Sequence, residues 1–158
     1  MNTAYVALGA NIGDPEATVL AAFAALANLP DSRVVHTSSL YRTAPVGLKH
    51  QPDFINAVAA LETGLDPEGL LDALLDLEAR FGRIRRHRNG PRTLDLDLLL
   101  YNDLELDLPR LTLPHPRLHL RAFVLQPLAE IAPGLAIPGR GSVAAWLPAV
   151  ANQGIARL

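Results

Sequence analysis

The sequence predicts an α+β fold in which an antiparallel sheet carries helices packed on one face. Short runs rich in β-branched and apolar residues recur along the chain. Asp-Pro pairs at 14–15 and 66–67 each precede a helix-like segment, and Gly or Pro separates the segments. With 158 residues, of which 49% are hydrophobic and 19% charged, the chain is expected to form one domain over 1–158 with a buried core.

The predicted elements follow the order strand, helix, strand, strand, helix, strand. Strands are expected over 3–8, 33–42, 54–61 and 95–101, and helices over 14–28 and 66–81. Asp14 and Asp66 are the expected N-caps of the helices, and Gly82 ends the second one. This order is typical of the ferredoxin-like fold and leaves the second face of the sheet for loops and ligands.

The remaining segments carry weaker patterns. Residues 43–52 and 83–94 are expected loops, and 102–116 is rich in turns, with a small hairpin. A helix is expected over 118–131, interrupted or bent near Pro127. The tail over 138–158 has no clear role, apart from a short helix around 142–147. Residues 9–13 lack the spacing of a phosphate-binding loop and are interpreted as a structural turn.

The composition excludes several classes of protein. The chain has no cysteine, which excludes disulfides, thiolate metal sites and cysteine nucleophiles. It has no apolar run near the ~20 residues of a membrane span, and its first residues do not resemble a secretory signal. We therefore expect a cytoplasmic protein with no membrane partner.

Asp95 and Asp97 stand two residues apart at the start of a predicted strand. Because side chains alternate across a strand, both carboxylates point to one face, with Cα atoms about 6.5–7 Å apart. Two like charges on one face repel each other unless a cation lies between them. The pair indicates a site for a hard divalent ion such as Mg²⁺, and an acidic solvent-facing strand is the simpler alternative.

Arginine dominates the cationic residues, with 13 Arg against one Lys, and six arginines fall between Arg80 and Arg92. Its planar fork matches phosphate oxygens. Three interpretations are open: a basic loop that is solvated or ion-paired with Glu78, Asp76 or Asp72 of the preceding helix, a nucleic-acid surface, or a lid that closes on a triphosphate. The neighbouring carboxylates favour the lid, because metal ligands beside phosphate-binding arginines are typical of phosphoryl transfer.

Four other residues suggest ligand binding. His115 has three arginines near it in sequence, which supports a phosphate contact, although a lone histidine is more often structural. Phe54 and Asn56 share one face of a predicted strand, so a ring and an amide point the same way. Together with Phe123, they suit a flat heterocycle with hydrogen-bonding edges, and core packing is the alternative for both phenylalanines.

Five segments resemble one enzyme family in order and spacing. They are ALGANIG at 7–13, SLYRTAP at 39–45, QPDFINA at 51–57, GPRTLDLD at 90–97 and LPH at 113–115. On these segments the chain resembles the 6-hydroxymethyl-7,8-dihydropterin pyrophosphokinases of folate biosynthesis over about residues 3–137. The segment at 90–97 is the most specific of the five.

The resemblance implies a ferredoxin-like fold and transfer of diphosphate from ATP to the pterin hydroxymethyl group, with release of AMP. It implies two Mg²⁺ ions on Asp95 and Asp97, with Arg83 and Arg92 as further catalytic residues. The residues implied to contact ATP, its phosphates or the closing loop are Glu78, Arg85, Arg88, Arg92, Leu98, Arg110, Thr112, His115 and Arg121. Those implied to form the pterin pocket are Thr43, Pro45, Val46, Phe54, Asn56, Asp95 and Phe123.

The sequence departs from the family pattern at three loop positions. Asn89 stands where many members have Trp, Ala44 where Pro is common, and Pro116 where Tyr is common. The expected partners are ATP and the hydroxymethyl dihydropterin, without nucleic acid, and the chain is expected to be a monomer. Two alternatives are a non-catalytic ferredoxin-like domain that binds RNA or another anion, and a metal-dependent phosphohydrolase.

Overall fold

The computed structural model describes residues 1–44, 52–82 and 93–158. Up to the second gap, its elements are β1 (Asn2–Ala10), α1 (Pro15–Ala27), β2 (Ser32–Thr37), β3 (Tyr41–Thr43), β4 (Phe54–Thr63) and α2 (Pro67–Arg80). After that gap they are β5 (Asp95–Tyr101), β6 (Leu106–Leu108), β7 (Leu111–Leu113), α3 (Ala122–Ile131), β8 (Ala136–Ile137), β9 (Gly141–Ser142), α4 (Val143–Trp146) and β10 (Ile155–Arg157). Short 3₁₀ turns cover Leu118–Leu120 and Leu147–Val150.

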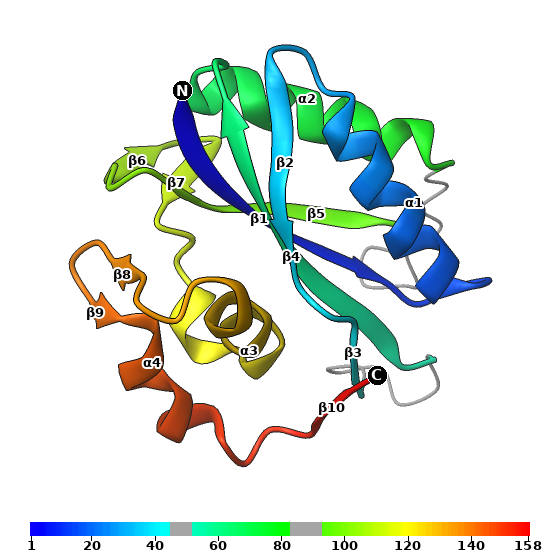
Figure 1. The fold of residues 1–158 in the computed structure, drawn as a ribbon, viewed down its shortest axis with the longest axis vertical. Helices are drawn as coiled ribbons and strands as arrows, with labels where there is room; N and C mark the ends of the chain where they lie inside the picture. Colours follow the sequence, from blue (N-terminus) through cyan, green and yellow to red (C-terminus); the bar gives the residue numbers. More distant parts are fainter. Residues whose placement is uncertain (45–51, 83–92) are drawn as a thin grey trace.

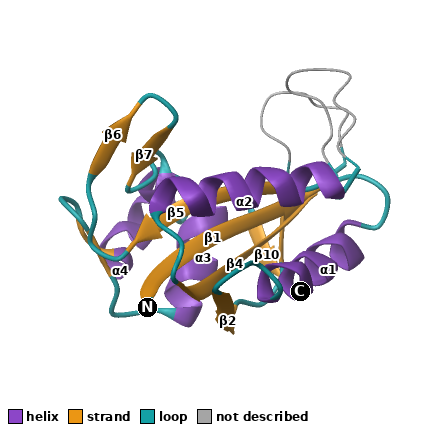
Figure 2. Cartoon of the chain, turned by 90° about the horizontal axis from the view of Figure 1, so that it is seen from above, coloured by secondary structure: helices purple, strands orange, loops and turns teal. Residues whose placement is uncertain are grey.

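The main sheet runs in the order β10–β3–β4–β1–β5, and β2 also pairs with β4 (Figure 1). All of these pairings are antiparallel. The hairpin predicted within 102–116 is present as β6 and β7, which stand out beyond the end of the sheet (Figure 2).

Both predicted helix starts are confirmed. The side chain of Asp14 accepts a hydrogen bond from the Ala17 N–H at 3.2 Å, and that of Asp66 accepts from the Gly69 N–H at 2.7 Å. A proline follows each cap. Because first-turn N–H groups have no partner within their own helix, these caps fix where α1 and α2 begin.

Two hydrophobic cores lie on opposite faces of the sheet. On one face, alternate residues of β1 and β4 pack with α1 and α2. On the other face, Val58 and Leu99 pack with Leu125 and Leu128 of α3. The predicted ferredoxin-like class is confirmed, with α1 and α2 on one face, and α3 in addition covers part of the face expected for loops and ligands.

The single strand predicted over 33–42 is wrong, because the chain forms two strands separated by residues 38–40. At the break, the Ser38 hydroxyl accepts from the Val58 N–H at 2.9 Å. The Ser39 N–H donates to the Glu130 carboxylate at 3.0 Å. Side chains thus replace ladder bonds where the strand breaks, a common role of serine.

The helix predicted over 118–131 begins later than expected, at Ala122, and it continues through Pro127. The tail runs around α3 and ends as β10, which pairs with β3 at the edge of the sheet (Figure 1). Sequence patterns did not predict this strand. None of the helices in the described ranges has the length and apolar character needed to cross a bilayer.

Candidate active site

Asp95 and Asp97 lie at the start of β5 on the face away from α1 and α2. Leu96, between them, points into the core shared with those helices. Alternation therefore puts both carboxylates on the opposite face, as predicted. In register, Asp95 lies opposite Gly9 of β1 and Asp97 opposite Ala7, and both aspartates are partly exposed.

The backbone between the two aspartates is held by Glu78 of α2. Glu78 is only 3% exposed, and its carboxylate accepts a hydrogen bond from the Leu96 N–H at 2.7 Å. The family resemblance implied that Glu78 borders the nucleotide. In the structure its carboxylate holds the strand that carries the aspartate pair.

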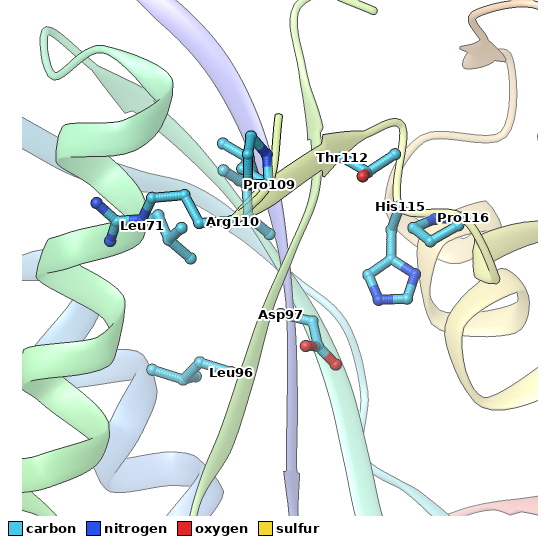
Figure 3. A pocket seen from close by; sticks show the side chains of 10 residues that line it. Leu71, Leu96, Asp97, Pro109, Arg110, Thr112, His115 and Pro116 are labelled. Carbon is cyan, nitrogen blue, oxygen red and sulfur yellow. The ribbon is translucent and has the colours of Figure 1, made fainter. Parts of the chain in front are cut away.

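A pocket of about 290 Å³ opens at the edge of β5 (Figure 3). It is lined by five of the predicted site residues, namely Asp97, Leu98, Arg110, Thr112 and His115. The other lining residues are apolar: Leu71, Leu96, Pro109, Leu111 and Pro116. Figure 3 shows Asp97, Thr112 and His115 on one side of β5, with Leu71 and Leu96 on the other.

His115 presents an uncharged ring to this pocket. Its Nδ1 accepts a hydrogen bond from the Arg117 N–H at 3.2 Å, so the ring proton lies on Nε2. Burial, together with the charges of Arg121 and Arg117, lowers the pKa of His115 to about 4. At neutral pH the ring can therefore donate one hydrogen bond to an anion without carrying a charge.

Arg121 and Phe123 come from the start of α3. The guanidinium carbon of Arg121 lies 5.4 Å from the centre of the Phe123 ring, a cation–π contact. Burial lowers the pKa of Arg121 from its usual value, while the charges of Asp97 and Asp95 act in the opposite direction. The cation thus lies within the field of both carboxylates.

Arg110 lines the pocket, but its guanidinium is already engaged. Its Nη2 donates a short hydrogen bond to Asp72 of α2, and both side chains are largely exposed. This contact raises the pKa of Arg110. A phosphate that binds Arg110 must therefore compete with the Asp72 carboxylate.

A second group of predicted residues meets on β3 and β4. Asn56 donates from Nδ2 to the Thr43 hydroxyl at 2.8 Å, and Phe54 lies on the same strand face as Asn56. Phe123 packs against the core on this side of the sheet. The structure thus joins Thr43 to Asn56 and puts both phenylalanines on the same side of the sheet.

Gly9 was predicted to begin a turn, which is wrong, because β1 continues to Ala10. Gly9 pairs with Asn56 on one side and Asp95 on the other. A Cβ atom here would lie 3.2 Å from the Asn56 Oδ1, so a larger residue would crowd that amide. A glycine inside a strand often marks such a close approach, and this signal was available in the sequence.

The burial of Asn11 was also not predicted, because residues 9–13 were interpreted as a structural turn. It is only 1% exposed, and its Nδ2 donates to the Pro52 carbonyl at 3.3 Å. The predicted site residues that lie outside the described residues are Pro45, Val46, Arg83, Arg85, Arg88 and Arg92. The predicted arginine lid lies there too.

The chemistry of the aspartate pair fits part of a magnesium site. Within the described ranges, no cluster of three or more His, Cys, Asp or Glu side chains could hold a metal ion. The protein ligands that the site offers are thus the two carboxylates of Asp95 and Asp97. This number suits Mg²⁺, which commonly takes one or two carboxylates, with phosphate oxygens and waters as its other ligands.

The family model for 7,8-dihydro-6-hydroxymethylpterin-pyrophosphokinase matches residues 5–133. Two bacterial relatives are each named 2-amino-4-hydroxy-6-hydroxymethyldihydropteridine pyrophosphokinase. That of Pseudomonas aeruginosa is 49% identical over 154 residues, which cover 98% of this chain and 95% of the relative. That of Haemophilus influenzae is 48% identical over 138 residues, which cover 87% and 86%.

A similar fold occurs in the crystal structure of Plasmodium falciparum HPPK-DHPS wild type with pteroate. The TM-score is 0.76 at 14% sequence identity, which supports the fold alone. The match covers 94% of this chain and 42% of that longer chain. By the family match and the bacterial relatives, the chain belongs to the 7,8-dihydro-6-hydroxymethylpterin-pyrophosphokinase family.

Proposed function

We propose that this protein transfers a diphosphate group from ATP to the hydroxymethyl group of 6-hydroxymethyl-7,8-dihydropterin, releasing AMP, in folate biosynthesis. One observation supports it most strongly: in a chain of this family, Asp95 and Asp97 share one sheet face beside a pocket that contains His115. The pair supplies carboxylates for a metal, and the pocket supplies a hydrogen-bond donor for phosphate.

In the proposed reaction, the pterin hydroxyl oxygen attacks the β-phosphorus of ATP in line. The bond from the β-phosphorus to the oxygen bridging the α-phosphate breaks, so that AMP leaves, and the proton of the attacking hydroxyl is released to solvent. Such transfers depend mainly on positioning and on stabilising charge. Two Mg²⁺ ions, when bound by Asp95 and Asp97, would supply positive charge for the attacking and leaving oxygens.

The chain's own residues bind and orient the two substrates in this proposal. The His115 Nε2–H and the Arg121 guanidinium donate to phosphate oxygens. Phe54 and Phe123 hold the flat pterin between them, and Asn56 forms hydrogen bonds with its edge.

The test is incubation of the protein with ATP, Mg²⁺ and the hydroxymethyl pterin. We expect AMP and pterin diphosphate in equal amounts, and no AMP when the pterin is omitted. AMP release without the pterin would instead indicate a hydrolase. No AMP release, together with salt-dependent RNA binding, would indicate a binding domain.

The role of the aspartates is tested with Asp95→Asn and Asp97→Asn in single-turnover assays. Each change removes one charged metal ligand, so we expect the rate of AMP formation to fall by more than about tenfold, or ~1.4 kcal/mol. Asp103→Asn, at an exposed position after the same strand, is the control and should retain the wild-type rate. A smaller loss in both site variants would show that the metal binds elsewhere.

A further inference from the structure

Arg121 occupies an unusual position for an arginine. It is the N-cap residue of α3, and its side chain makes no capping hydrogen bond. Ser, Thr, Asp and Asn favour this position because their side chains accept from first-turn N–H groups. A guanidinium has no acceptor, and its charge is unfavourable at the positive end of the helix dipole. Arginine at this position therefore costs helix stability unless another group supplies the cap.

Gln153 supplies this cap from a distant part of the chain. Its Oε1 accepts from the Ala122 N–H at 2.8 Å, and its Nε2 donates to the Leu120 carbonyl at 2.9 Å. One amide thus binds the backbone on both sides of Arg121. Because both contacts are to backbone groups, they fix the peptide units from which the Arg121 side chain extends.

Gln153 is itself held within the tail. Its N–H donates to the Val150 carbonyl at 3.0 Å, and Val150 is buried against the α3 core. Two residues further on, Ile155 of β10 pairs with Thr43, whose hydroxyl accepts from Asn56. The tail therefore connects the start of α3 to the sheet edge that carries Thr43 and Asn56.

We propose that Gln153 is a positioning residue for diphosphate transfer, acting through Arg121. This inference rests on the proposed function. The Gln153 amide fixes the start of α3 so that the guanidinium stays over the Phe123 ring and within the field of Asp95 and Asp97. Gln153 lies outside residues 5–133, the range that the family model matches.

The main test is Gln153→Met, which keeps the side-chain length but removes both amide contacts. We expect kcat/KM for AMP release to fall about tenfold, because small displacements of a catalytic cation are costly. Gln153→Glu retains an oxygen for the Ala122 N–H and should lose less. Asn152→Ala, a neighbouring exposed amide in the same turn, is the matched control and should keep wild-type activity. Wild-type activity in Gln153→Met would overturn the inference.

A double-mutant cycle with Arg121→Ala separates positioning from a general effect on folding. If Gln153 acts through Arg121, then Gln153→Met should have little further effect on the single-turnover rate in the Arg121→Ala background. An equal loss in both backgrounds would overturn the inference. Thermal unfolding of each variant identifies any loss of activity that is due to misfolding. If Gln153→Met misfolds, the rate of Gln153→Glu is compared with that of the wild type in both backgrounds instead.

Hydrogen exchange at the Ala122 amide gives a readout that needs no catalysis. We expect faster exchange there in Gln153→Met than in Asn152→Ala, because the amide loses its acceptor. Unchanged exchange would overturn the cap itself. If the wild-type protein releases no AMP, the proposed function is wrong. Faster exchange at Ala122 in Gln153→Met would then show that the Gln153 cap is nevertheless present.

Discussion

A single buried polar residue holds the backbone between Asp95 and Asp97 in place. This residue is Glu78, whose carboxylate accepts from the Leu96 N–H inside the core. A buried backbone donor that loses its acceptor costs about 1–3 kcal/mol. The same bond fixes the peptide between Asp95 and Asp97, so stability and catalysis should both depend on it.

Glu78→Ala tests this dependence. We expect the free energy of unfolding in urea to fall by about 1–3 kcal/mol, and the rate of AMP formation to fall as well. Glu78→Gln keeps an oxygen acceptor and should lose less of both. Glu68→Gln, at an exposed position of α2, is the control. If Glu78→Ala matched the wild type in both measurements, Glu78 would have no role in holding the strand.

Asp72→Asn tests whether the ion pair with Arg110 competes with nucleotide. Without the carboxylate charge, the guanidinium is released toward the pocket, so we expect ATP binding to tighten by up to about fivefold. Calorimetric titration with a non-hydrolysable ATP analogue and Mg²⁺ measures this change. Asp76→Asn breaks the Arg80 pair on the same helix and is the matched control. Weaker binding in Asp72→Asn would mean that Asp72 assists the site.

Among the elements, the 3₁₀ turn before α3 depends on an uncharged histidine. His119 is buried, with Nε2 2.7 Å from the Arg140 Nη1 and its ring centre 4.8 Å from that of Trp146. Arginine can only donate, so Nε2 accepts and the ring is neutral. Burial, and then the charge of Arg140, lowers the pKa of His119. The contact between this turn and the tail is therefore sensitive to pH.

The sign of this pH dependence follows from the lowered pKa. The unfolded chain protonates His119 below about pH 6.5, whereas the folded chain keeps it neutral to lower pH. This contribution to stability is complete above that pH and is lost as the pH falls.

We expect the free energy of unfolding in urea to decrease from pH 7.5 to pH 5.5, and to decrease less in His119→Phe. His115, whose pKa is also lowered, contributes in the same direction in both proteins. His36→Gln, on an exposed part of β2, should behave as the wild type. An identical slope in His119→Phe would show that His119 does not titrate differently on folding.

Elements with local signals were predictable from the sequence, whereas those fixed by distant partners were not. Asp14 and Asp66 cap their helices within three residues, so their pattern was sufficient. The break after β2 depends on Glu130, which is 91 residues from Ser39. The start of α3 depends on Gln153, 31 residues from Ala122. Local propensity carries no information about such long-range contacts.

At the scale of the whole molecule, the sheet joins site segments that lie far apart in the chain. Alternation and family resemblance predicted the aspartate pair and the pocket residues around Thr112. They did not predict that Arg110 pairs with Asp72 or that Glu78 holds Leu96, because those contacts require two elements to be packed together. The sequence of the tail gave almost no indication of its secondary structure, because β10 is short and forms a strand only by pairing with β3.

Labelled ATP tests diphosphate transfer at this site most directly. In a single turnover with Mg²⁺ and the hydroxymethyl pterin, we predict that a label on the α-phosphate appears in AMP. A label on the γ-phosphate should appear, in equal amount, in the pterin product. Formation of ADP, or release of the γ-label as free phosphate, would contradict attack at the β-phosphorus.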